Sequence, residues 1–383
     1  MILLALIVLL SIIVFYGILQ TEFSGLVKFF LVIIEMIIVS QVLIRKYKFP
    51  SEMGLILLKS KKGIEMIGRL AGKRHFWEFF SDTGSTISYG LLSTLLMRRN
   101  TAWKSVAVGM ILLVFISTFV APLSLEFLKT VISGASILEK EDAIKIGDGQ
   151  IFALVMLAVL LLGGFFGVLV LSIIYYGVYV FLNIAELVLT GVDTISSTAP
   201  GGTLLLPGVN LPFFEGILAL IVIMVVHEGS HAVLARIANV PIRSSGIVLF
   251  GIIPVGAFVE PDEKELEKIE KIKQTRVLAA GSTANFISSI LFLIVFVALA
   301  LLLNGNIFGE SGLFYQAARF LYITTGLAFS LNFIVATVNL LPLPLFDGYR
   351  ILDVNMKNKT LLKALMYITL AAFVMNFLPW FFV

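Results

Sequence analysis

The sequence predicts an all-α polytopic membrane protein with about nine transmembrane helices, in a range of about 7–10, and a short β-hairpin at the membrane boundary. Hydrophobic residues make up 59% of the 383 residues and charged residues only 14%, whereas soluble domains carry about 25% charged residues. The hydrophobic residues form runs long enough to cross a hydrocarbon core of about 30 Å. Residues 242–259 instead combine β-branched and aromatic residues with Pro254 and Gly256, which favours a strand pair over a helix.

The predicted spans follow one another along most of the chain. The first apolar run has no basic leader and no small-residue cleavage site, which favours a retained anchor helix. Residues 151–189 are too long for one crossing at about 1.5 Å per residue, so we expect two helices joined at glycines, or one helix with a re-entrant segment. The spans are expected at residues 1–19, 25–44, 106–128, 151–189, 213–239, 277–303, 319–341 and 361–383.

The spans divide the chain into four expected regions. Residues 1–104 form a two-helix anchor and a basic segment, residues 105–203 add transmembrane helices, residues 204–353 form a core, and residues 354–383 form a last transmembrane helix. Residues 45–104 hold 12 of the 28 basic residues against 4 acids, so the positive-inside rule places this segment in the cytoplasm. Four apolar residues recur there at roughly helical spacing, which predicts an amphipathic segment along the membrane surface. They are Ile56, Ile64, Ile67 and Leu70.

The composition also excludes several kinds of site and partner. The chain has no cysteine, so it forms no disulfide, no thiolate zinc site and no cysteine nucleophile. Its formal charge of +4 is too small for the electrostatic footprint of a nucleic-acid-binding protein. We therefore expect the lipid bilayer as a partner and no nucleic acid.

Residues 213–239 combine an apolar run with His227-Glu228-Gly229-Ser230-His231, the pattern H-E-x-x-H. Residues four apart lie on one face of a helix, so both imidazoles can bind one metal ion with Glu228 beside it. Zinc suits such a pair, because it binds imidazole nitrogen and keeps one position open for water in catalytic sites. The alternative is an accidental pair of core histidines, but ionisable groups inside a membrane are costly and commonly functional. The pattern thus predicts one Zn²⁺ per chain, with Glu228 as the general base.

A catalytic zinc needs a third protein ligand, and elimination favours Asp347. The acidic residues near apolar runs are Glu35, Glu186, Glu215 and Asp347. Asp347 is predicted on the same side as the two histidines, and Pro342 and Pro344 hold the backbone before it out of a regular helix. Such broken backbone at membrane depth is tolerated where it lines a cavity. The alternative for Asp347 is an ordinary Asp-Gly turn; Glu35 is expected to be paired inside the bundle, and His75 to be solvated or interfacial.

With these motifs the chain resembles the site-2 protease family of intramembrane zinc metalloproteases. His227 to His231 is similar to the family's zinc-binding helix. Residues 339–348, Asn-Leu-Leu-Pro-Leu-Pro-Leu-Phe-Asp-Gly, are similar to its second signature, with phenylalanine where leucine is usual. Residues 281–285 resemble its Gly-Pro-x-x-Asn pattern, with serine in place of proline, and residues 246–259 resemble its substrate-facing strand. The resemblance covers roughly residues 204–353.

The resemblance implies a metalloendopeptidase that hydrolyses peptide bonds within or near transmembrane helices of membrane-protein substrates. Its site would face the cytoplasmic side of the cell membrane, with His227, His231 and Asp347 as zinc ligands and Glu228 as the base. The family suggests Asn285 as a donor to the tetrahedral oxyanion, and an amide that joins two helices is the alternative for it.

Two other functions stay open. One is a membrane metalloprotease of another zinc family, which takes its third ligand from a glutamate on a later helix and acts on soluble or lipidated peptides. The other is a non-catalytic metal-binding or transport protein of the membrane. The presence of Glu228 speaks against the second, because a site that only holds a metal has no need of a base there.

Overall fold

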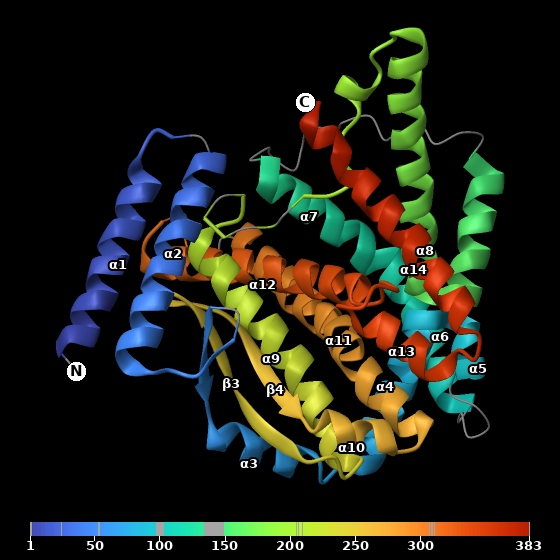
Figure 1. Cartoon of the computed structure of the whole chain (residues 1–383), viewed down its shortest axis with the longest axis horizontal. Helices are drawn as coiled ribbons and strands as arrows, with labels where there is room; N and C mark the ends of the chain where they lie inside the picture. The colour runs from blue at the N-terminus through green and yellow to red at the C-terminus, as the bar shows by residue number, and fades with distance from the viewer. Residues whose placement is uncertain are drawn as a thin grey trace.

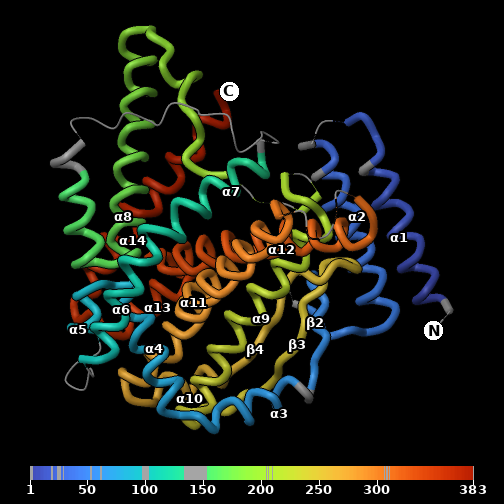
Figure 2. Tube along the Cα trace, turned by 180° about the vertical axis from the view of Figure 1, so that it is seen from behind, coloured from blue at the N-terminus to red at the C-terminus, as the bar shows by residue number. Residues whose placement is uncertain are grey.

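A computed structural model shows a helical bundle with a small antiparallel sheet on one side (Figure 1; Figure 2). It describes residues 2–23, 25–52, 54–96, 103–133 and 149–382, apart from 204, 206, 209, 306, 308 and 310. The helices of the first half are α1 (Ile2–Gln20), α2 (Gly25–Tyr47), α3 (Lys61–Leu70), α4 (Arg74–Tyr89), α5 (Ser93–Leu96), α6 (Trp103–Phe115), α7 (Ala121–Ser133) and α8 (Gly149–Thr190). The later helices are α9 (Phe213–Ile237), α10 (Glu263–Lys268), α11 (Lys271–Asn304), α12 (Leu313–Val338), α13 (Asp347–Asn355) and α14 (Lys359–Phe377).

Among the described residues, 6 helices are long and apolar enough to cross a membrane. They are Trp103–Ile132, Ala153–Thr190, Phe213–Ile237, Lys271–Asn304, Leu313–Val338 and Lys359–Phe381. Such a set is that of a multi-pass membrane protein. The expected count of about nine spans is not confirmed: α1 and α2 are helices as predicted but are not among the 6, and residues 153–190 count as one span.

The long apolar stretch of α8 is two helices joined at a break, as the sequence predicted. Gly164 has φ 60° and ψ −157°, which no helix contains. Gly90, which follows α4, also has a positive φ of 57°. The two breaks lie against each other, because a Cβ on Gly164 would stand 2.5 Å from the backbone nitrogen of Gly90. Glycine is required at both positions, since it alone adopts this backbone without strain and leaves the space free.

The predicted hairpin is present as β3 (Ile242–Phe250) and β4 (Ile253–Pro261), but it belongs to a larger sheet. The strand order is β1-β2-β3-β4, in which β1 is Ser51–Glu52 and β2 is Leu55–Lys59. Each residue of β2 from Ile56 to Lys59 pairs with β3. The prediction of helical spacing that began at Ile56 was therefore wrong for that residue, whereas Ile64, Ile67 and Leu70 do lie on one helix, α3. Because β2 covers β3, the edge strand next to α9 is β4.

The centre of the molecule is a row of packed elements, seen in Figure 2 from α6 through α4, α11 and α9 to β4 and β3. Helix α12 packs against both α11 and α9. Small residues allow the close approach in this row. A Cβ on Gly84 of α4 would lie 1.8 Å from the Thr283 hydroxyl oxygen of α11, and one on Gly109 of α6 would lie 2.5 Å from Thr86 of α4. The row places α9 between α11 and the sheet.

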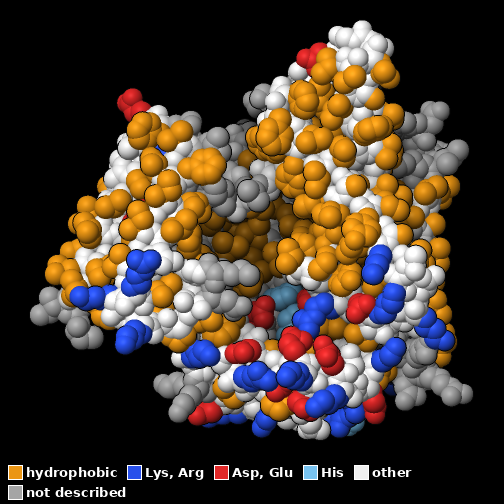
Figure 3. All heavy atoms as spheres, viewed as in Figure 1, with side chains coloured by type: hydrophobic (Ala, Val, Ile, Leu, Met, Phe, Trp, Pro, Cys, Tyr) orange, Lys and Arg blue, Asp and Glu red, His pale blue; other side chains and the backbone are white. Residues whose placement is uncertain are grey.

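Charged side chains gather at one end of the molecule, where α3 and α10 lie (Figure 3). Above them the surface is hydrophobic and is hollowed between the α1–α2 side and the α8–α14 side. Histidine side chains are visible at the lower end of this hollow, next to the charged band. A titratable site thus lies where the apolar part of the surface meets the charged part.

Candidate metal centre

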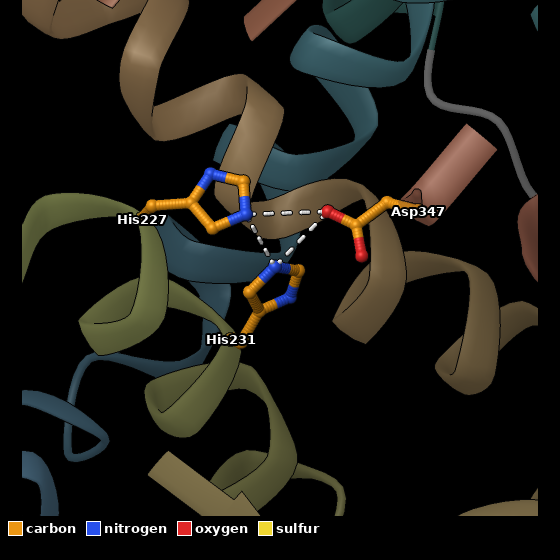
Figure 4. A group of neighbouring side chains, drawn as sticks. All are labelled: His227, His231 and Asp347. Carbon is orange, nitrogen blue, oxygen red and sulfur yellow. Dashed lines mark hydrogen bonds and ion pairs between the residues drawn. The ribbon is translucent and has the colours of Figure 1, made fainter. Parts of the chain in front are cut away.

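Two histidines of α9 and one aspartate at the start of α13 converge on one point (Figure 4). His227 Nε2 lies 3.1 Å from His231 Nε2. Asp347 Oδ2 lies 3.3 Å from the first of these nitrogens and 3.2 Å from the second. Among the described residues, these three form the one group of at least three histidine, aspartate or glutamate side chains that could hold a metal ion.

The three atoms fit one face of a tetrahedral metal site. With metal–ligand bonds of about 2.0–2.1 Å, neighbouring ligand atoms in a tetrahedron lie about 3.3–3.4 Å apart. The observed separations of 3.1, 3.3 and 3.2 Å are close to that value. Asp347 Oδ2 is buried and has no hydrogen-bond partner among the described residues, which is costly for a carboxylate oxygen unless a cation satisfies it. Two imidazoles and one carboxylate with an open fourth position are a donor set that zinc accepts.

The ring of His231 is held by the backbone of α11. Its Nδ1 lies 2.7 Å from the carbonyl oxygen of Val277. A carbonyl only accepts hydrogen bonds, so Nδ1 carries the proton and donates it. Nε2 then presents its lone pair toward Asp347 and His227, which is the tautomer that binds a metal.

The ring of His227 is held by Asn285, also from α11. His227 Nδ1 lies 3.1 Å from the side-chain nitrogen of Asn285, and the other amide atom, Oδ1, is buried without a partner. The orientation of an amide is an assignment based on its hydrogen bonds. When the amide is turned by 180°, Oδ1 accepts the proton of His227 Nδ1 and so has a hydrogen-bond partner. With its proton on Nδ1, His227 presents the lone pair of Nε2, which is the tautomer that binds a metal. The contact therefore supports a positioning role for Asn285, and its role as oxyanion donor stays a prediction.

Helix α11 approaches the two imidazoles so closely that only glycine fits at position 281. A Cβ there would lie 2.4 Å from His231 Nε2 and 2.5 Å from His227 Nε2. These separations are near the length of a metal–nitrogen bond. A methyl group on residue 281 would thus clash with both imidazoles at the nitrogens that face Asp347.

Asp347 is positioned by a closed loop. Helix α12 ends before Asn339, and the chain returns so that the amide of Gly348 donates to the carbonyl of Asn339 at 2.8 Å. A Cβ on Gly348 would lie 2.0 Å from the carbonyl oxygen of Leu340, so the loop closes only with glycine there. The Pro342 and Pro344 segment between them has no helical structure, as the sequence predicted.

Glu228 directly follows His227 on α9 but is not one of the three converging residues. It is partly exposed. The other candidate acids are elsewhere. Glu35 accepts a hydrogen bond of 2.7 Å from the Ser11 hydroxyl inside the α1–α2 pair, which confirms the expected pairing, and Glu186 accepts one of 2.9 Å from Thr194. His75 is exposed.

Comparisons with known proteins support the motif reading. Residues 215–378 match the model of peptidase family M50, the family of the site-2 proteases. The chain is 33% identical over 114 residues to an uncharacterized protein of Methanocaldococcus jannaschii, and the alignment covers 29% of this chain and 30% of that protein. No solved structure matches the chain. The matched residues 215–378 carry both histidines and Asp347, so it is this region of the chain that is similar to peptidase family M50.

Proposed function

We propose that the chain is a zinc-dependent intramembrane endopeptidase that hydrolyses peptide bonds within or near transmembrane helices of its substrates. The observation that carries this proposal is the convergence of three ligand atoms, 3.1–3.3 Å apart, inside a bundle of apolar helices. The family supports it, because M50 peptidases are membrane metalloproteases. Since an aspartate completes the group, the alternative of a zinc family with a glutamate as third ligand has no support among the described residues.

The chain's own residues have separate tasks in this reaction. A zinc ion held by His227, His231 and Asp347 would supply Lewis acidity toward the scissile carbonyl and a water of lowered pKa. Glu228 is next to one ligand on the same helix and partly exposed, so it can take the proton of the attacking water and return it to the leaving amine. Asn285 and Val277 hold the two rings in the orientation that the reaction needs.

The sheet and the hollow support a membrane-embedded substrate. Carbonyls of an intact transmembrane helix are hydrogen-bonded, so hydrolysis requires local unwinding where the freed groups find partners. Strand β4 pairs with β3 on one side only, and an edge strand can pair with an extended peptide. It packs against α9, the helix with both histidines. The hydrophobic hollow of Figure 3 would shield the rest of the substrate from water.

The proposal is tested by adding a purified single-span protein to the purified chain. We expect one zinc per chain, cleavage within or near the span, loss of cleavage after chelation and recovery with zinc. Proline at alternate positions of β4 should slow cleavage while zinc content stays the same, because proline removes a backbone donor. Cleavage that persists in the zinc-free protein would rule out the proposed chemistry.

We also propose that the chain lies in the cell membrane with its metal centre toward the cytoplasm. The basic segment before α6 supports this orientation through the positive-inside rule, and α3 and α10 place charged residues at the same end (Figure 1). The chain has no cysteine, so a single cysteine introduced in α10 can be followed without background. We expect a membrane-impermeant thiol reagent to label it in inside-out vesicles and not in intact cells; the reverse pattern would invert the orientation.

A further inference from the structure

Helix α4 lies outside the family match, yet it is buried at the centre of the bundle. The match covers residues 215–378, whereas α4 is Arg74–Tyr89. Its second half is buried on all sides although most of it is polar. The buried residues are Ser81, Asp82, Thr83, Gly84, Ser85, Thr86, Ile87, Ser88 and Tyr89. Polar side chains at such a place are costly unless they have partners, so their contacts indicate what the helix does.

The strongest of these contacts is an ion pair between Asp82 and Arg276 of α11. Arg276 Nε lies 2.7 Å from one carboxylate oxygen of Asp82, and Arg276 Nη2 lies 2.7 Å from the other. The side chains are only 8% and 16% exposed. Two parallel charge-assisted hydrogen bonds fix both the distance and the angle between their partners. The Ser81 hydroxyl adds a third bond of 2.8 Å to the carbonyl oxygen of Arg276.

Arg276, which Asp82 holds, is next in sequence to Val277, and Val277 holds His231. Arg276 precedes Val277, whose carbonyl accepts the proton of His231 Nδ1 at 2.7 Å. Further along α11, Gly281 touches both imidazoles on one side, and Thr283 touches Gly84 of α4 on the other. Helix α11 is therefore confined between α4 and the histidines, and a small shift of α11 changes both ring contacts.

We propose that Asp82 is a positioning residue of the metal centre: through Arg276 it fixes α11 in the place where that helix orients the two histidines. A helix outside the family-matched region is then required for tight metal binding by residues inside it. The proposal rests on the proposed metal site, and it does not depend on whether the chain cleaves peptides.

The test compares zinc affinity of the full-length chain and Asp82→Asn by competition with a chromophoric chelator. Asparagine has the shape of aspartate but carries no charge, so the largely buried guanidinium of Arg276 is left with Glu78, at 3.3 Å, as its acidic partner and loses the paired hydrogen bonds that fix its position. We expect one zinc per chain in both proteins and an affinity about 10–100-fold lower in the variant, the usual effect of losing support behind a ligand. The absorption spectrum of the cobalt-substituted protein should also change, because it reports ligand geometry. An affinity within about threefold of the wild type and an unchanged spectrum would overturn the proposal.

A matched control separates positioning from general destabilisation. Asn376 of α14 is likewise buried. Its side-chain amide donates to the carbonyl of Ile173 in α8 at 3.0 Å, which joins the two helices, and to the carbonyl of Ala372 in its own helix at 2.7 Å. Asn376→Ala should lower the melting temperature but leave zinc affinity and the cobalt spectrum unchanged. An equal loss of affinity in this control would overturn the proposal. If Asp82→Asn does not fold, Ser81→Ala, which removes only the hydroxyl bond to Arg276, should show a several-fold loss, and an unchanged affinity would count against the role of α4.

Discussion

Replacing Glu228 by glutamine should abolish peptide hydrolysis while the chain still binds one zinc. Glutamine keeps the shape of glutamate but cannot accept the proton of the attacking water at neutral pH. Glu228 is not one of the three converging ligands, so the metal contacts stay. General base catalysis contributes about 10²–10⁴ to a rate, and we expect a loss of at least that size in kcat. The measurement is cleavage of a single-span substrate together with zinc per chain.

Helix α9 offers a matched control for this change. Glu215 lies in the first turn of the same helix, about 20 Å from Glu228 along the helix axis. Glu215→Gln makes the same chemical change and should leave both cleavage and zinc content as they are in the wild type. Equal activity of Glu228→Gln and the wild type would contradict the proposed base. Loss of zinc in Glu228→Gln would instead make Glu228 part of the ligand set.

The fold could be predicted where the sequence signal is local. Apolar length alone identified α9, α11, α12 and α14, and glycine and proline punctuation identified the β3–β4 hairpin. Strand β2 was missed because its partner, β3, lies nearly 190 residues away, and no local spacing carries information on such a pairing. The sequence also gave no reason to expect that the polar half of α4 is buried, because its burial depends on small residues of other helices, such as Gly109 and Thr283.

The candidate site, like the fold, could be predicted where the sequence signal is local and not where it depends on contacts between distant residues. The pattern H-E-x-x-H and the prolines before Asp347 indicated the three residues that the structure brings together. Elimination led to the acid that the structure places beside both histidines, because the chain has no cysteine and only three histidines, which left few alternatives for a third ligand. The contact of Asn285 with His227 could not be predicted, since it depends on how α11 crosses α9. The Asp82–Arg276 pair could not be predicted either, because it joins residues 194 positions apart.

Gly281 lies where α11 comes closest to the two imidazoles of α9, and we expect a substitution there to have a large effect on metal binding. Gly281→Ala should yield a folded chain that no longer binds zinc and no longer cleaves peptides. The new methyl group would stand 2.4 Å from His231 Nε2 and 2.5 Å from His227 Nε2. Both rings would have to move away from it, and their nitrogens would then no longer lie where both can bind one metal at about 2.0–2.1 Å. The same substitution should stabilise helix α11 itself, because alanine favours a helix over glycine by about 1 kcal/mol. Zinc content and circular dichroism measure the two effects separately.

Gly229 is the control for this substitution, because it carries the same chemical change into the same motif. It lies between the two histidines in sequence, but nothing stands within 4 Å of a Cβ built there. Gly229→Ala should therefore keep its zinc, and it should be as stable as the wild type or slightly more stable. If Gly281→Ala also retained one zinc per chain with unchanged affinity, α11 could not lie against the imidazoles as observed. The positions of Val277, Asn285 and Asp82 relative to the metal would then be wrong as well, since all three depend on the same helix crossing.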